Sequence, residues 1–287
     1  MARSDKKFAG HEHEDHDLGL VHDLEVLGRR RALALIGAAS LVPLLAACGD
    51  SPFFDRAEAE VIAHSADGSQ CVAHPSETAG PYPADGSNRA HGTLANVLDK
   101  SGIVRGDMRP GLEAGQPVAE GVPLELEVEL VSVANACAPL AGYAIYLWHC
   151  DAAGRYSIYD LPGTSYLRAV GVADTAGKVM FQTIFPGCYR GRFPHMHFEI
   201  YPSLEQATDY RNRILTSQLA MPEPLCQEVY DASMPYKESI GNYAGSPLSR
   251  DGIFANNTPV QLAAQTPELT GDPAKGYRGR VVIGVKA

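Results

Sequence analysis

The pattern of hydrophobic and polar residues predicts short β-strands separated by turns. Residues 124–130 read Leu-Glu-Leu-Glu-Val-Glu-Leu, so apolar side chains alternate with glutamates as on a strand with one buried face. Residues 143–149, 178–185 and 278–285 are further strand candidates, rich in aromatic or β-branched residues and near turn residues. The pattern therefore predicts a mainly β fold, a β-sandwich or a barrel.

The C-terminal third has a different pattern. Short helices are expected over residues 203–207 and 223–232. Residues 242–275, rich in Ser, Gly, Asn and Pro, are expected to form loops, as are residues 71–92, where Gly and Pro are dense. The chain shows no internal repeat and no second domain boundary.

The segment 195–201 carries the strongest candidate chemistry. Its alternation places His195 and His197 on one face of a strand, about 7 Å apart along it. Two adjacent imidazoles can bind one metal ion, although a solvated strand face with two polar histidines is the simpler alternative. The preceding loop, 186–194, brings Tyr189 and Arg192 near the same point, and Tyr156 follows the strand at 143–149.

These side chains form a possible mixed donor set of two phenolates and two imidazoles: Tyr156, Tyr189, His195 and His197. A tyrosine ionises far below its usual pKa, near 10, only beside a strong Lewis acid, and Fe(III) fits this better than Zn(II). The alternative is that both tyrosines are ordinary sheet-edge aromatics, because the chain has 13 tyrosines.

Composition and charge narrow the class of partner. The chain has 287 residues, of which 45% are hydrophobic and 20% charged, ordinary values for a soluble globular protein. Its net charge is −10, and no dense Lys/Arg cluster follows residue 31. Both facts argue against nucleic acid as a partner.

The first seventy residues resemble an export signal and a tether. Arg29-Arg30-Arg31 precede an apolar run that ends in Leu45-Ala46-Ala47-Cys48. This predicts a signal peptide over residues 1–47, with either a twin-arginine or a general secretory signal. The last four residues resemble a bacterial lipobox, which predicts lipidation of Cys48 and a cell-envelope location. Residues 48–70 are then the anchor and tether, and residues 71–287 one domain.

Five cysteines follow Cys48, and an exported protein can form disulfides. Five residues allow two bridges and one free thiol, with a connectivity that the sequence does not determine. Cys137 and Cys150 flank a turn and could be bridged across it.

Three segments together resemble the intradiol ring-cleavage dioxygenases, the non-haem iron family of catechol and protocatechuate dioxygenases. They are residues 77–82 (Glu-Thr-Ala-Gly-Pro-Tyr), 147–157 (Leu-Trp-His-Cys-Asp-Ala-Ala-Gly-Arg-Tyr-Ser) and 186–198 (Pro-Gly-Cys-Tyr-Arg-Gly-Arg-Phe-Pro-His-Met-His-Phe). The resemblance covers roughly residues 71–201 and the closing strand. It implies that family's β-sandwich, with short helices and long loops in the C-terminal third.

The resemblance also implies an activity and residue roles. Tyr156 and His197 would be equatorial ligands of Fe(III), and Tyr189 and His195 axial ligands. Tyr189 would leave the metal and act as a base, and Arg192 would stabilise negative charge on the substrate. Such an oxidoreductase opens a catechol-type ring with O2, between the two hydroxyl-bearing carbons, and gives a muconate-type diacid.

The same resemblance assigns Pro81 and Tyr82 to the substrate wall; a rigid loop without such a role is a nearly equal alternative. The loop between Tyr189 and His195 is shorter than in the best-known members, which predicts a more open pocket. The main alternative function is a non-catalytic envelope β-sandwich lipoprotein that binds metal, aromatics or a protein partner. A hydrolytic zinc site is disfavoured because no carboxylate is placed as its base.

Overall fold

The computed structural model describes residues 59–287. The expected signal peptide, Cys48 and the first part of the tether therefore lie outside the described residues. The rest of the tether segment includes a strand, β1 (Ile62–His64), which pairs with β2 (Gln70–Val72). No helix among residues 59–287 has the length and apolar character needed to cross a membrane.

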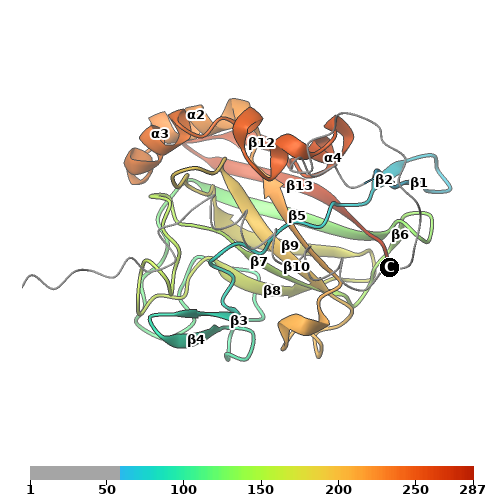
Figure 1. The fold of residues 1–287 in the computed structure, drawn as a ribbon, viewed down its shortest axis with the longest axis horizontal. Helices are drawn as coiled ribbons and strands as arrows, with labels where there is room; N and C mark the ends of the chain where they lie inside the picture. Colours follow the sequence, from blue (N-terminus) through green and yellow to red (C-terminus); the bar gives the residue numbers. More distant parts are fainter. Residues whose placement is uncertain (1–58) are drawn as a thin grey trace, which may run out of the picture.

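Two sheets form the centre of the molecule (Figure 1). The first, a four-stranded antiparallel sheet, has the order β11 (Leu215–Ala220), β10 (His195–Tyr201), β7 (Ala144–Trp148) and β8 (Arg168–Val172). The second has the order β12 (Glu268–Asp272), β13 (Gly276–Val285), β5 (Pro123–Ser132) and β6 (Ala138–Pro139), and β9 (Lys178–Ile184) also pairs with β5. β13 and β5 are parallel, from the pair Tyr277 and Leu124 to the pair Val285 and Ser132.

The main core lies where the apolar faces of the two sheets meet. The alternating apolar residues of β5 are at most 1% exposed, and Phe198 of β10 and Phe181 of β9 belong to the same buried cluster. Burying a large apolar side chain contributes about 1.5–3 kcal/mol, so this face holds the sheets together. The predicted alternation over residues 124–130 and the predicted β-sandwich fold are confirmed.

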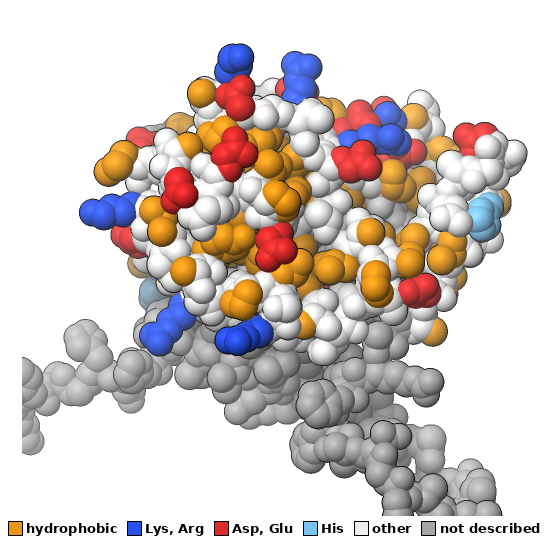
Figure 2. Space-filling model, turned by 90° about the horizontal axis from the view of Figure 1, so that it is seen from above, with side chains coloured by type: hydrophobic (Ala, Val, Ile, Leu, Met, Phe, Trp, Pro, Cys, Tyr) orange, Lys and Arg blue, Asp and Glu red, His pale blue; other side chains and the backbone are white. Residues whose placement is uncertain are grey.

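Shorter elements surround the sandwich. The hairpin of β3 (Asp85–Ala90) and β4 (Thr93–Asn96) lies at one end, opposite the helices α2 (Glu223–Ala232), α3 (Lys237–Ala244) and α4 (Pro259–Ala264) (Figure 1). Single 3-10 turns occur at Tyr210–Asn212, Met234–Tyr236, Leu248–Arg250 and Phe254–Asn256. Seen from the helical side, apolar side chains are interspersed with acidic and basic ones (Figure 2).

The helix expected over residues 223–232 is confirmed by α2, but the one expected over 203–207 is wrong. There the bond from the Ala207 amide to the Ser203 carbonyl (3.2 Å) closes one turn that does not continue. Residues 242–275 are not all loop, because they contain α4 and β12. Thr258 begins α4 with a capping box to Gln261, a signal visible in the sequence.

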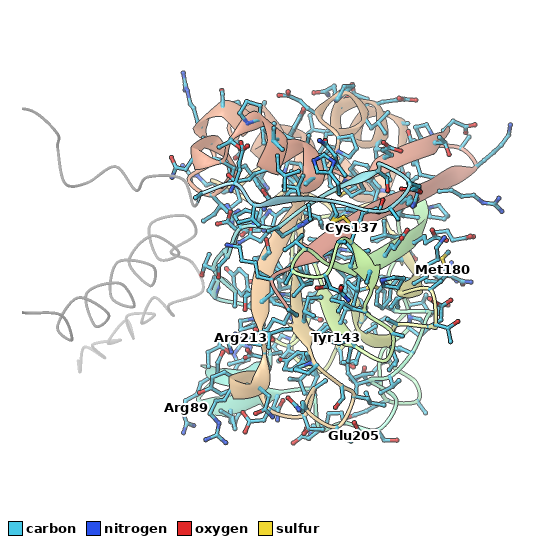
Figure 3. The ribbon with its side chains drawn as sticks, turned by 90° about the vertical axis from the view of Figure 1, so that its right-hand side faces the viewer. Arg89, Cys137, Tyr143, Met180, Glu205 and Arg213 are labelled. Carbon is cyan, nitrogen blue, oxygen red and sulfur yellow. A yellow bond between two sulfur atoms is a disulfide. The ribbon has the colours of Figure 1, made fainter. Side chains whose placement is uncertain are left out.

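One disulfide, between Cys71 and Cys137, is present among the described cysteines, and it joins β2 to the turn after β5 (Figure 3). Cys150, Cys188 and Cys226 are free and buried. The bridge considered between Cys137 and Cys150 is wrong. Cys137 is bonded to Cys71 instead, and Cys150 is a buried free thiol just after the end of β7.

Candidate active site

The candidate site lies on the face of the four-stranded sheet that points away from the main core. His197 of β10 pairs with Gln218 of β11 on one side and Trp148 of β7 on the other, and Trp148 pairs with Arg168 of β8. Residues directly opposite one another in a sheet share a face. Gln218, His197, Trp148 and Arg168 therefore form one cross-strand row, and every member is at most 1% exposed.

The two imidazoles meet end to end. Their Nε2 atoms are 3.0 Å apart, and the Nδ1 atom of His195 lies 2.5 Å from the Phe193 carbonyl oxygen. Because a carbonyl only accepts, that Nδ1 carries the proton, and the unprotonated Nε2 of His195 faces the His197 Nε2 and the Tyr189 hydroxyl. Burial, with the charge of Arg192 adding to it, lowers the pKa of both histidines well below 6.5. Both rings are thus neutral.

The spacing of these nitrogens fits a shared metal ion. Two nitrogen ligands about 2.1 Å from one ion and at a right angle to each other lie about 3.0 Å apart. The observed separation of the two Nε2 atoms, 3.0 Å, matches this value. Trp148 stacks on His197 with ring centroids 5.0 Å apart and planes 7° apart, and this contact fixes the orientation of that imidazole.

Both candidate tyrosines border the histidine pair. The Tyr189 hydroxyl lies 3.4 Å from the Nε2 of His195, and the Tyr156 ring is 5.7 Å from the Tyr189 ring and 6.3 Å from that of His197. Tyr156 is completely buried, and within residues 59–287 its hydroxyl has no hydrogen-bond partner. Leaving a buried hydroxyl unpaired costs about 1–3 kcal/mol, which a bound cation would offset.

Burial, with the neighbouring Tyr189 adding to it, raises the pKa of Tyr156 well above 10. Tyr156 is therefore a neutral phenol in the metal-free protein, and only a strongly charged cation would ionise it at neutral pH. Tyr189 is half-buried, so of the two phenols it is the more accessible to solvent.

Two glycines allow the tyrosine-bearing loops to lie close together. A Cβ atom on Gly154 would lie 2.5 Å from the Cys188 carbonyl oxygen, and one on Gly187 would lie 2.4 Å from that of Asp151. The Gly187 amide donates to the same Asp151 oxygen at 3.1 Å. The absence of side chains at these two positions therefore permits Tyr156 and Tyr189 to converge on one point.

Arg192 is fixed next to the imidazoles by buried partners. Its Nε atom lies 3.0 Å from Asp251 Oδ2, and its Nη2 donates to Gln218 Oε1 at 2.6 Å. Asp251 also accepts from the amides of Phe193, Ile253 and Phe254. Arg192 and Asp251 are both about fully buried, so the guanidinium is held in place as a charged donor at the edge of the site.

Tyr82 covers the tyrosine pair. Its ring stacks on Tyr156, with centroids 4.4 Å apart, and meets the edges of Tyr159 at 5.4 Å and Tyr189 at 6.1 Å. Pro81 is buried, and its carbonyl accepts from Asn88 Nδ2 at 2.6 Å. The structure thus places Tyr82 against both candidate tyrosine ligands and ties Pro81 to the β3–β4 hairpin.

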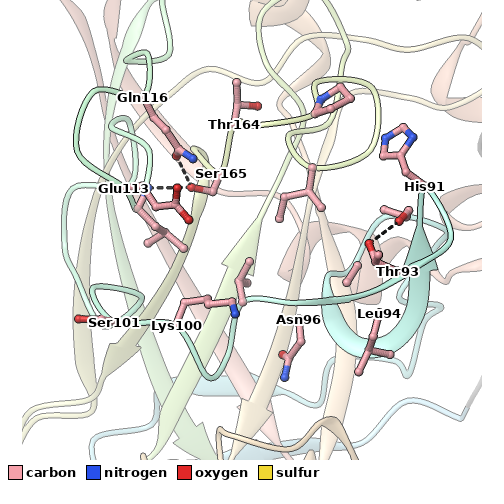
Figure 4. Close-up of a pocket in the computed structure, with 17 residues that line it drawn as sticks. His91, Thr93, Leu94, Asn96, Lys100, Ser101, Glu113, Gln116, Thr164 and Ser165 are labelled. Carbon is pink, nitrogen blue, oxygen red and sulfur yellow. Dashed lines mark hydrogen bonds between the residues drawn. The ribbon is translucent and has the colours of Figure 1, made fainter.

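A cavity of about 570 Å³ opens beside that hairpin (Figure 4). Lys100, Glu113, Gln116 and Ser165 are among its lining residues, and the Ser165 hydroxyl bonds to Gln116. Ile158 also lines it, two residues after Tyr156, but none of the four candidate donors does. This cavity is therefore separate from the point where the donors converge.

The structure brings together all four predicted donors, Arg192 and Tyr82. Among residues 59–287 no group of three or more His, Cys, Asp or Glu side chains could hold a metal ion, so this set depends on its two tyrosines. The sequence pattern did not reveal Asp251 or Gln218. Asp251 lies in a segment that was predicted to be loop. Gln218 lies on β11, a strand that no clear alternation of apolar and polar residues predicted.

We expect Gly187→Ala to destabilise the protein by about 1–3 kcal/mol, because its Cβ would clash with two carbonyl oxygens of the 151–152 segment, at 2.4 and 2.6 Å. The matched control is Gly241→Ala in α3, whose Cβ would meet nothing within 4 Å and which should be neutral or stabilising by about 1 kcal/mol. Urea unfolding measures both. Equal midpoints for the two variants would show that the close approach is not required.

We expect Asp251→Asn to lower the free energy of unfolding by about 3–5 kcal/mol at pH 7, because it leaves Arg192 buried without its counter-charge. Burial opposes ionisation of Asp251, but the Arg192 charge and several hydrogen bonds outweigh it and lower its pKa below 3.8. A carboxyl group whose pKa is lower in the folded than in the unfolded protein stabilises the fold at pH values above its unfolded pKa. This contribution disappears as the pH falls through its folded pKa.

The difference in the free energy of unfolding between wild type and Asp251→Asn should therefore become smaller below about pH 4. Denaturant titrations at several pH values measure it. Asp107→Asn serves as the control, since Asp107 forms a half-exposed pair with Arg109 and should cost no more than about 1 kcal/mol. A difference in unfolding free energy that does not change with pH would contradict the role of Asp251 as the ionised partner of Arg192.

The chain is similar to known dioxygenases in part of its sequence and in its fold. Residues 112–211 match the family model Dioxygenase_C, described as "Dioxygenase". No curated protein sequence matches the chain. Among solved structures, an intradiol ring-cleavage dioxygenase from Tetranychus urticae is 22% identical with a TM-score of 0.56, over 75% of this chain and 95% of that one.

Two further structures are similar. A dioxygenase named Tetur07g02040 gives 22% identity and a TM-score of 0.56, over 75% of this chain and 94% of that one. The dioxygenase domain of a carbohydrate-binding fusion from Streptomyces sp. SirexAA-E gives 22% identity and a TM-score of 0.46, over 75% of this chain and 99% of that one. Residues 112–211 therefore match the dioxygenase family model, and the chain has the fold of the intradiol ring-cleavage dioxygenases.

Proposed function

We propose that this protein is a non-haem Fe(III) dioxygenase that opens a catechol-type ring with O2 between its two hydroxyl-bearing carbons. The product would be a muconate-type diacid. The observation that carries the proposal is the convergence of two imidazole nitrogens 3.0 Å apart, with the Tyr189 hydroxyl 3.4 Å from one of them. The Tyr156 hydroxyl, which has no hydrogen-bond partner within residues 59–287, lies beside them.

The donor set favours a hard, highly charged ion. Tyr156, Tyr189, His195 and His197 would hold it, and a phenolate at Tyr156 requires a cation because burial raises the pKa of that phenol. Ferric iron, when bound, supplies a Lewis acid that binds the two hydroxyl oxygens of a catechol and makes the ring reactive toward O2.

The chain's own residues would do the rest. Tyr189 is the half-buried donor, so it is the better placed of the two to exchange with an incoming substrate and accept its proton. The Phe193 carbonyl keeps the His195 tautomer whose Nε2 carries no proton. Arg192, fixed by Asp251 and Gln218, offers positive charge in a site that excludes water, where such charge is most effective.

The test is to load the protein with iron and record its visible spectrum, then add catechol in air. Iron-bound tyrosinate gives a charge-transfer band, so the wild type should be coloured and catechol should shift the band. With ¹⁸O2, both oxygen atoms should enter the ring-opened product. Tyr156→Phe and Tyr189→Phe should weaken the band, whereas Tyr230→Phe, which loses only a bond to the Pro186 carbonyl, should keep it.

The outcomes separate the candidate functions. Colour without oxygen uptake over a range of catechols would favour the non-catalytic lipoprotein that binds metal or aromatics. A colourless protein with full iron occupancy would remove the tyrosines from the site and refute the dioxygenase proposal.

We also propose, from the sequence alone, that the chain is exported and held in a bacterial cell envelope by lipid at Cys48. Cell fractionation of the full chain should find it with membranes, and Cys48→Ser should release it or block its processing. Cys226→Ser is the matched cysteine control and should not alter the location. Equal distribution of the wild type and Cys48→Ser would overturn the proposal.

A further inference from the structure

Arg168 is a fully buried arginine on β8, at the end of the cross-strand row. Within residues 59–287 it forms no ion pair. Buried charges are normally paired, because leaving water costs an ionised group several kcal/mol. Neutral hydrogen-bond acceptors must therefore satisfy this guanidinium.

All of its hydrogen bonds go to two loops and one tyrosine. Its Nε donates to Ser157 Oγ at 3.0 Å, and its Nη2 donates to the Ser157 carbonyl at 3.1 Å. Its Nη1 donates to the Pro83 carbonyl at 2.9 Å and to the Tyr146 hydroxyl at 3.1 Å. The Tyr146 hydroxyl in turn donates to the same Pro83 oxygen at 2.7 Å.

Each of these loop positions is next to an aromatic residue of the site. Ser157 follows Tyr156, and Pro83 follows Tyr82. These two rings stack with centroids 4.4 Å apart. A single rigid guanidinium thus connects the backbones that carry both members of the stack, and its charge strengthens each bond to a neutral acceptor.

The same arginine is connected to the histidine side of the site. Tyr146, which accepts its bond, stacks on Trp148 with centroids 4.8 Å apart, and Trp148 stacks on His197 at 5.0 Å. Arg168 therefore meets both the tyrosine loop and the aromatic column that supports one histidine. None of its side-chain hydrogen bonds goes to a donor atom of the candidate metal site.

We propose that Arg168 is a positioning residue, which holds Tyr156 against Tyr82 and so presents the Tyr156 hydroxyl to the metal site. This proposal rests on the proposed function for the identity of the metal. A lysine cannot replace the residue, because its ammonium is a point charge, whereas the planar guanidinium binds two loops at once.

The experiment compares the iron affinity and the visible spectrum of wild type, Arg168→Lys and Arg168→Met. Loss of a residue that orients a ligand typically weakens metal binding by about 10- to 100-fold, and we expect this for both variants, with a weaker tyrosinate band. Arg105→Met is the matched control. Arg105 also donates to backbone carbonyls, at Arg168 and Pro110, but makes no bond to Pro83 or Ser157.

Tyr146→Phe is a milder variant if the Arg168 variants do not fold. It removes one hydroxyl between Arg168 and Pro83 and keeps a ring to stack on Trp148. We expect a smaller loss of iron affinity in the same direction. The iron affinity and the tyrosinate band could instead be the same in every folded variant as in a coloured wild type. This result would overturn the positioning role and leave the proposed function intact.

A readout without iron separates the two proposals. In the metal-free protein, amide hydrogen exchange over residues 156–160 should be faster in Arg168→Met than in wild type, and unchanged in Arg105→Met. If exchange rises as expected but the wild type stays colourless with iron, the proposed function fails while the positioning of Tyr156 stands. If exchange is unchanged in Arg168→Met, the positioning proposal fails whatever the spectrum shows.

Discussion

The outer face of the four-stranded sheet buries polar and charged side chains, and each must find a partner there. Arg168, Arg192, Glu199 and His197 are all at most 1% exposed. An ionised group that is buried without partners would cost several kcal/mol, a large part of the stability of a typical domain. Arg192 has Asp251 and Gln218, and Glu199 has Tyr201 and Arg213. This requirement fixes the surrounding loops more strictly than apolar packing alone would.

The same burial makes the metal-free state of the candidate donors energetically unfavourable. It lowers the pKa of both histidines and raises that of Tyr156, so all three side chains are neutral, and the Tyr156 hydroxyl has no partner in the described chain. A cation at the convergence point would pair with the lone pair of His195 and with an ionised Tyr156. Metal binding and stability should therefore be linked, since a ligand that binds only the folded state stabilises it.

The sequence alone predicted the features that follow from a period-2 pattern or from a contiguous motif. The alternating residues of β5 and the donors of β10 lie where the pattern indicated, because a strand with one apolar face has only one stable register against a core. Contacts between distant segments had no such signal. Asp251 meets Arg192 across 59 positions, and Arg168 meets Pro83 across 85. Likewise, no spacing rule could show that Cys71 pairs with Cys137 and leaves Cys150 reduced.

The parallel pairing of β13 with β5 has a consequence for biosynthesis. Tyr277 pairs with Leu124 and Val285 with Ser132, so β5 can pair with β9 early, but its other edge has no partner until residues 277–285 have been synthesised. Until then the paired edge of β5 offers open backbone groups to other chains. Contacts at this sequence separation also form slowly. The second sheet therefore stays incomplete until β13, far along the chain from β5, is available to pair with it.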